Sequence, residues 1–253
     1  MDTLIFLLNY PLVGTPAWFW LGFLGVVFAL LAFDLGVLNK DDKELGIAES
    51  LKLSAFYIAV AVVFGVWIHF SKGAEASLHY FTGYAIEKAL SIDNVFVISL
   101  IFTYFAIPRA LQYRALVWGI IAVLVMRGIM IGVGAALVQE YDWVLLFFGV
   151  FLVATGIKML VVKEGETDVS RNPVVRFLSR RMRVTDGLHG QRFFVRQPHP
   201  KTGRLVVWAT PLFLALVVIN VADLVFAVDS VPAIFAITTD TFIVFTANIM
   251  AIL

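Results

Sequence analysis

The sequence contains no cysteine and few charged residues. Without cysteine among its 253 residues, the chain forms no disulfide, no thiolate metal site and no thiol redox centre. Charged residues make up 15% of the chain and hydrophobic residues 61%, whereas soluble proteins carry about 25% charged residues. With a net charge of only +1, there is no general signature of a nucleic-acid partner. The composition therefore predicts an integral membrane protein whose main partner is the lipid bilayer.

Long apolar stretches organise the whole chain. A helix needs about 20 residues to cross the hydrocarbon core of a bilayer. Seven stretches are predicted to do so, the last of them incomplete: 17–38, 50–70, 76–106, 110–138, 143–162, 208–237 and 242 onward. Because the last stretch stops in mid-span, we expect further spans beyond it. The predicted fold class is all-α, a polytopic bundle of transmembrane helices forming one domain over 1–253.

The basic residues between these stretches predict the orientation. The connections after the first and third stretches contain Lys40, Lys43, Arg109 and Arg114, and the long one after the fifth contains many arginines. The other connections carry Lys72 alone. Since Lys and Arg accumulate in cytoplasmic loops, we expect an outside amino terminus and a cytoplasmic loop at 163–207.

Residues 163–207 form the only sizeable polar segment. Apolar positions between Val174 and Met182 recur at helical spacing among arginines, which is typical of an amphipathic helix lying on the membrane or the bundle. Two apolar runs flank Pro198 to Gly203 and predict a short β-hairpin. The segment is interpreted either as a solvated basic loop or as a regulatory or ligand-binding element.

An acidic signature occurs twice within the apolar stretches. The first copy has Glu87, Asp93 and Asn94, and the second has Asp223, Asp229 and Ser230. Each copy places two carboxylates six residues apart, followed by a small polar residue and a valine. A charge in the middle of a membrane helix costs about 2.5 to 3.5 kcal/mol on insertion scales. The four carboxylates must therefore be compensated, and the compensation points to function.

The two copies are predicted to run in opposite directions through the membrane. They lie in the third and sixth stretches, which are three crossings apart, and this is the arrangement of an inverted-topology repeat with a substrate site near the midplane. Residues seven apart share a helix face, so Glu87 aligns with Asn94, while Asp93 lies about 120° away. Each helix is therefore expected to lie between two partners or to be locally unwound. Counting from the membrane boundaries puts Asp93 and Asp223 near mid-depth, with Glu87 and Asp229 towards the outside.

The repeated side chains offer only oxygen ligands. Carboxylates with amide and hydroxyl oxygens suit Mn²⁺, Mg²⁺ or Ca²⁺. The candidate metal ligands are Glu87, Asp93, Asn94, Asp223, Asp229 and Ser230. Two ionised carboxylates balance one divalent ion, and the others could carry protons, which supplies a route to proton-coupled exchange. The alternative is that the acids are structural and pair with Lys88, Arg127 or backbone donors.

Four other polar residues are candidates for an ion pathway. Asp34 lies near the inner mouth of the first stretch, where it could admit ions. Lys88 adjoins Glu87 but points about 100° away. Arg127 lies deep in the fourth stretch and must pair, either as a structural counter-ion or as a gating element. Asn248 is a further candidate oxygen ligand.

The motifs resemble those of the TerC family of membrane proteins. The resemblance is carried by Phe81 to Tyr84, Glu87 to Phe96, Thr155 to Met159 and Asp223 to Asp240, and it covers nearly the whole chain. It is especially close to the bacterial Alx-like branch of the family, which is associated with manganese export. The resemblance implies a bundle of about nine helices, distantly similar to the LysE transporter superfamily, with the repeated acids as the metal site. It also implies the bacterial inner membrane.

The leading hypothesis is a secondary transporter that exports Mn²⁺ or a similar divalent ion, with no enzymatic activity and no permanently bound cofactor. An alternative is a membrane assembly or metal-delivery factor acting through residues 163–207. An intramembrane aspartyl hydrolase fits poorly, because four duplicated acids exceed the two that such a dyad needs.

Overall fold

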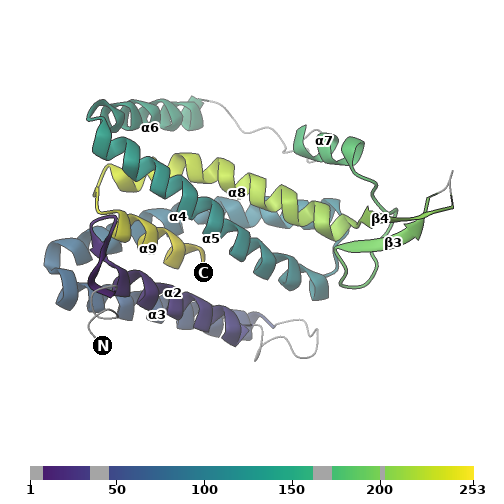
Figure 1. The fold of residues 1–253 in the computed structure, drawn as a ribbon, viewed down its shortest axis with the longest axis horizontal. Coiled ribbons are helices and arrows are strands. Elements are labelled where there is room, and N and C mark those ends of the chain that lie inside the picture. Colours follow the sequence, from purple (N-terminus) through teal and green to yellow (C-terminus); the bar gives the residue numbers. More distant parts are fainter. Residues whose placement is uncertain (1–7, 35–45, 162–172, 200–202) are drawn as a thin grey trace.

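The structure is a computed structural model that describes residues 8–34, 46–161, 173–199 and 203–253, and it is mainly helical (Figure 1). In chain order the elements are β1 (Pro11–Leu12), β2 (Thr15–Pro16), α2 (Ala17–Phe33), α3 (Ile47–Lys72), α4 (Ala74–Tyr104), α5 (Arg109–Glu140), α6 (Trp143–Val161), α7 (Pro173–Arg181), β3 (Phe194–Pro198), β4 (Leu205–Ala209), α8 (Pro211–Phe235) and α9 (Thr241–Ile252). Every predicted apolar stretch thus contains a helix.

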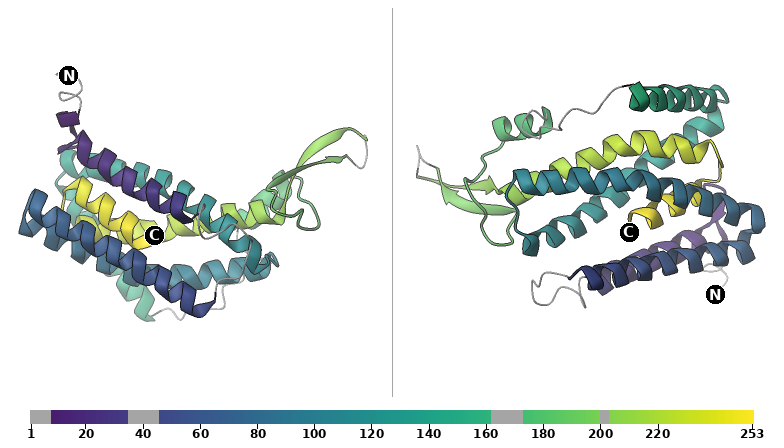
Figure 2. Two further views of the ribbon diagram at one scale, coloured as in Figure 1. Left: turned by 90° about the horizontal axis from the view of Figure 1, so that it is seen from below. Right: turned by 180° about the vertical axis from the view of Figure 1, so that it is seen from behind.

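The long helices lie side by side, with α4, α5, α8 and α9 in the middle of the bundle (Figures 1 and 2). Helix α4 contacts α3, α8 and α9, and α5 contacts α8 and α9. Helix α6 covers α8 on one side, and α2 and α3 lie on the other. Every residue of α9 from Thr241 to Ala251 is buried, so this short helix forms the centre of the core.

The apolar composition of the helices has two outcomes. In the core, rings such as Phe23, Phe64 and Phe242 pack together and are at most 8% exposed. On the outside, Val63, Leu146 and other large apolar side chains remain exposed. Helices that are apolar on all faces are typical of a membrane bundle. Three of the described helices, α3, α5 and α8, are long and apolar enough to cross a membrane, whereas α4, which is comparably long, has three charged residues close together near its middle, Glu87, Lys88 and Asp93.

Helices α4 and α8 run antiparallel. Near the beginning of α4, a Cβ added at Gly83 would lie 3.1 Å from the side chain of Ile234, near the end of α8. At the other end, Ile101 and Phe102 of α4 share a core cluster with Leu212 and Ala215 of α8. The two acidic signatures therefore run in opposite directions. Both helices are continuous across their signatures, so the local unwinding considered for them is not found.

Helix α7 and the hairpin of β3 and β4 lie at one end of the bundle (Figure 1). The strands pair antiparallel, from Phe194 opposite Ala209 to Pro198 opposite Leu205. Arg114 at the start of α5 holds the base of the hairpin, because its Nη1 donates to Gln191 Oε1 at 2.5 Å and its guanidinium lies 5.6 Å from the Phe193 ring. The hairpin thus contacts α5 as well as α8, into which β4 leads directly and where Phe213 packs against Phe194.

Some expectations concern residues outside the described ranges. The predicted end of the first stretch, with Lys40 and Lys43, falls in residues 35–45, and part of the basic loop falls in residues 162–172 and 200–202. The pairing of β1 with β2 before α2 was not predicted, because two strands of two residues leave no periodic pattern.

Candidate cation site

Arg127 of α5 lies where the two acidic signatures meet. Its Nε donates to Asp223 Oδ2 at 3.0 Å, and its Nη2 donates to Asp223 Oδ1 at 2.8 Å. Its Nη1 donates to Glu87 Oε1 and, at 2.8 Å, to Asn248 Oδ1. The guanidinium therefore joins α4, α8 and α9 to α5.

This cluster is removed from solvent. The side chains of Arg127 and Glu87 are 0% and 1% exposed, and that of Asp223 is 12% exposed. Breaking a buried pair of this kind leaves an uncompensated charge and costs about 3 to 5 kcal/mol. The bidentate contact with Asp223 and the contact with Glu87 show that the first acid of each signature has an ion-pair partner.

The second acids of the signatures lie elsewhere. Asp229 accepts a hydrogen bond of 3.5 Å from Thr155 Oγ1 of α6. Thr155 belongs to a motif of the family resemblance, but the sequence did not predict it as a partner of Asp229. The backbone of Asp93 lies within α4, but its side chain is outside the described residues. Helix α8 thus lies between two partners, with Asp223 facing α5 and Asp229 facing α6.

The shared contact on Arg127 corrects the predicted depths. Glu87 lies level with Asp223, not further out beside Asp229. At 1.5 Å per residue, six residues separate the two acids of each signature by about 9 Å along the helix axis. Because α4 and α8 are antiparallel, the positions of Asp93 and Asp229 are displaced in opposite directions from the cluster. The six signature residues do not converge at one point.

Several buried oxygen atoms around this arrangement lack donors. Among the described residues, Glu87 Oε2, Asn94 Oδ1 and Ser230 Oγ are buried without a hydrogen-bond partner, as is the amide nitrogen Nδ2 of Asn248. Buried polar groups in proteins nearly always have partners. Unpaired acceptors at corresponding positions of both signatures are the chemistry that a cation would satisfy.

No preformed cluster of three or more acidic or histidine side chains suited to a metal ion occurs in the described part of the chain. Two of the candidate carboxylates are already bound to Arg127. In the arrangement seen here, the first acids of the two signatures therefore hold a fixed cation of the protein itself, and of their carboxylate oxygens Glu87 Oε2 is left without a partner among the described residues.

The other candidate residues have different surroundings. Lys88 donates to the backbone oxygen of Ala251 at 2.9 Å, near the end of α9, so its partner is a carbonyl rather than a carboxylate. Asp34, directly after α2, lies near the phenol groups of Tyr57 on α3 and Tyr113 on α5. Asn248 joins the central cluster, where its Oδ1 accepts a hydrogen bond from Arg127; its role as a metal ligand stays a prediction.

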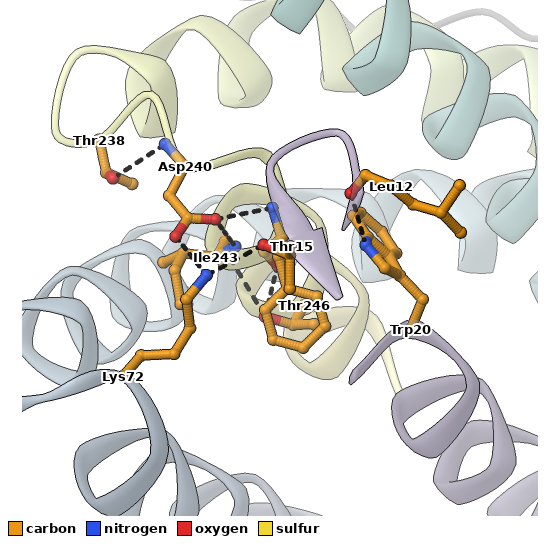
Figure 3. Close-up of polar contacts among 9 residues, drawn as sticks. Leu12, Thr15, Trp20, Lys72, Thr238, Asp240, Ile243 and Thr246 are labelled. Atoms are coloured by element: carbon orange, nitrogen blue, oxygen red, sulfur yellow. Dashed lines mark hydrogen bonds and ion pairs between the residues drawn. The ribbon is translucent and has the colours of Figure 1, made fainter. Parts of the chain in front are cut away.

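A second polar network lies at the turn between α8 and α9 (Figure 3). Lys72 Nζ lies 2.5 Å from Asp240 Oδ2 and 3.1 Å from Thr15 Oγ1. Asp240 also caps α9, since its Oδ1 accepts from the backbone N–H of Phe242 and Ile243. An adjoining cavity of about 510 Å³ includes Glu75 and His79 in its lining. The Asp240 contribution was not predicted, although an aspartate before an apolar helix is a typical N-cap.

These features define the class of protein: a polytopic helical membrane protein with a charged cluster buried between its helices. The chain belongs to the TerC family of integral membrane proteins, whose family model matches residues 72–253. The family membership suggested by the sequence motifs is thus confirmed.

The chain is also similar to curated bacterial proteins. It is 41% identical over 245 residues to the uncharacterized membrane protein STKORF319 of Myxococcus xanthus, covering 97% of this chain and 75% of the relative. It is 41% identical over 250 residues to the Escherichia coli protein named "Putative membrane-bound redox modulator Alx", covering 95% and 76%. A Rickettsia bellii uncharacterized membrane protein is 42% identical over 234 residues, covering 92% and 76%. No solved structure matches the chain.

Proposed function

We propose that the protein is a secondary transporter that exports a divalent metal cation, most of all Mn²⁺, in exchange for protons. The observation that carries the proposal is the meeting of Glu87 and Asp223 at one buried guanidinium from antiparallel helices. Inverted-repeat transporters bind their substrates where equivalent segments of the two halves meet near the midplane. A purely structural pair would not require the same signature on both helices.

The available ligand chemistry supports a hard cation. Carboxylate, amide and hydroxyl oxygens are the ligands that Mn²⁺, Mg²⁺ and Ca²⁺ accept. Glu87 Oε2, Asn94 Oδ1 and Ser230 Oγ are buried without donors among the described residues. In this proposal they are partners of the passing ion. The ion is the transported substrate, so no resident cofactor and no enzymatic reaction are assigned.

The second acids of the signatures, Asp93 and Asp229, are displaced from the central cluster, and this fits a pathway with several binding positions better than a single metal site. In the proposal, Asp229 and Ser230 form one station beyond the central cluster, and Asp93 and Asn94 form the corresponding station on its other side. Each station would exchange the ion with one face of the membrane. Asp34 would admit ions on the cytoplasmic side, and the amino terminus would lie outside the bacterial inner membrane.

Transport can be tested with the full-length protein in sealed vesicles that carry a pH gradient. We expect Mn²⁺ flux that is reduced at least tenfold by Glu87→Gln, Asp223→Asn or Asp229→Asn. Glu140→Gln is the matched control, since Glu140 is exposed at the end of α5, and its flux should equal that of the unaltered protein. Inhibition of the Mn²⁺ flux by added Mg²⁺, Ca²⁺ or Zn²⁺ measures the ion preference of the protein. Unchanged flux in all three site variants would refute the proposal.

A second candidate function is that of a membrane assembly or metal-delivery factor. It is favoured by one observation: Phe177 of α7 and Leu205 and Val207 of β4 are exposed beside several arginines. Such a surface suits a protein partner. This candidate predicts that Leu205→Ser with Val207→Ser abolishes function and releases co-purifying proteins, while Asp223→Asn does not.

Redox modulation, part of the name of the Alx relatives, is not proposed for this chain. Its 253 residues contain no cysteine, so these residues supply no thiol chemistry.

A further inference from the structure

Arg127 binds the oxygen atoms that a transported cation would need. Both oxygen atoms of Asp223, one of Glu87 and the amide oxygen of Asn248 accept its hydrogen bonds. Carboxylate and amide oxygens are also the usual ligands of a hard divalent ion. The guanidinium is completely buried, so it does not exchange these partners for water in this arrangement.

The charges make simultaneous binding unfavourable. Glu87 and Asp223 contribute two negative charges, and Arg127 contributes one positive charge. A divalent ion bound to the same carboxylates would lie within a few ångströms of the guanidinium, and like charges at such a distance repel strongly where water is absent. Release of the guanidinium would instead leave two carboxylates to neutralise one divalent ion.

We propose that Arg127 is a tethered competitor of the transported cation: the ion displaces it from Glu87 and Asp223, and its return expels the ion. The inference rests on the proposed transport function and assigns a specific role within it. Arg127 would then be the gate between the two stations that flank the central cluster.

Neutral acceptors are present for the displaced side chain. Asn248 Oδ1 already contacts Nη1 at 2.8 Å and need not be given up. Asn220 precedes Asp223 by one turn on α8, and its Oδ1 is buried without a hydrogen-bond partner among the described residues. Neutral amide oxygens can hold the guanidinium without competing with the ion for its charge-balancing carboxylates.

The proposal makes a prediction that a structural ion pair does not. If Arg127 only supports the fold, its removal should weaken or leave unchanged the binding of Mn²⁺. If Arg127 competes with the ion, removal of its charge should strengthen binding while translocation slows, because nothing then expels the ion.

The test measures Mn²⁺ binding to the purified full-length protein by calorimetry, and Mn²⁺ flux in vesicles. For Arg127→Gln we expect an affinity at least tenfold higher than that of the unaltered protein, with flux reduced at least tenfold. Arg127→Lys keeps the charge but loses the planar fork that binds carboxylates in a bidentate manner. Its affinity for Mn²⁺ should therefore lie between those of the unaltered protein and Arg127→Gln. Gel filtration establishes that each variant is folded.

If Arg127→Gln does not fold, the Mn²⁺ affinity of Arg127→Lys is compared with that of the unaltered protein to decide whether Arg127 competes with the ion. An affinity equal to or below that of the unaltered protein overturns the competition. The two proposals can fail separately. Normal flux in the unaltered protein without tighter binding in the variants refutes competition alone. Tighter binding in the variants of a protein without flux refutes transport alone.

Discussion

The carboxylates of Glu87 and Asp223, carried by antiparallel helices, contact different nitrogen atoms of the same Arg127 guanidinium. Neither acid is compensated by a neighbour on its own helix. The stability of the central helices and the state of the proposed site therefore depend on the same three side chains.

The two aspartates of the second signature should differ in their contribution to stability. Asp223→Asn removes the charge from a bidentate buried pair and should lower the free energy of unfolding by about 3 kcal/mol. Asp229→Asn affects one long hydrogen bond from Thr155 and should cost less than about 1 kcal/mol. Thermal unfolding in detergent compares the two variants. Equal destabilisation would contradict the assignment of Asp223 to the central cluster.

Asp240 should contribute to stability through both of its carboxylate oxygens. Lys72→Met and Asp240→Asn each weaken the contact between α3 and α9 but preserve a capping oxygen, and each should cost about 0.5 to 1 kcal/mol. Asp240→Ala also removes the cap and should cost about 1 kcal/mol more. The free energies of unfolding of the three single variants and of the double variant Lys72→Met with Asp240→Asn are measured. Together they give the coupling energy between Lys72 and Asp240. If Asp240→Ala behaves as Asp240→Asn does, the cap contributes nothing.

Gly65 should not tolerate a side chain. A Cβ there would lie 2.3 Å from the ring of Phe81, whereas one at Gly132 would meet nothing within 4 Å. Gly65→Ala should therefore separate α3 from α4 and destabilise the protein by about 1 to 3 kcal/mol. Gly132→Ala, the helical control, should be neutral or stabilising by up to about 1 kcal/mol. A tolerated Gly65→Ala would show that the two helices do not approach this closely.

Lys88 should matter less for ion flux than Glu87 does. It donates to the carbonyl of Ala251, and Lys88→Met should cost about 1 to 1.5 kcal/mol through that lost hydrogen bond. The Mn²⁺ flux per folded molecule of Lys88→Met should stay within about twofold of that of the unaltered protein, whereas Glu87→Gln should lose about tenfold or more. Vesicle flux normalised to folded protein checks this, and a loss as large as that in Glu87→Gln would place Lys88 in the pathway.

Because these 253 residues contain no cysteine, cysteines introduced one at a time can test the orientation. Single cysteines at Glu75 and Asp142 should react with a membrane-impermeant maleimide in intact cells, and one at Arg204 should react only after lysis. All three native side chains are exposed. Labelling of Arg204→Cys from outside would reverse the predicted topology.

The sequence was sufficient to predict the family, the helical membrane architecture and the opposite directions of the two signatures. Apolar length and the duplicated motif carry this information directly. Helical geometry also indicated that the two acids of one copy would face different partners, as found for Asp223 and Asp229.

The partners themselves could not be read from the sequence. Whether Arg127 meets Glu87, Asp93, Asp223 or Asp229 depends on the rotation and axial shift of four helices, which are set by packing between segments distant in the chain. The different depths predicted for Glu87 and Asp223 were wrong for the same reason. The contact of Lys88 with a backbone carbonyl was not predictable either, because every helix offers such groups near its end.

The anchoring of the hairpin by Arg114 has a mechanical consequence. Arg114 and Arg127 belong to one continuous helix, and at 1.5 Å per residue they are separated by about 20 Å along its axis. Since β4 also runs directly into α8, a load applied to the hairpin would be shared by α8, through the chain, and by α5, through Gln191 and Phe193. The hairpin is therefore joined to both helices that form the bidentate ion pair, α8 with Asp223 and α5 with Arg127.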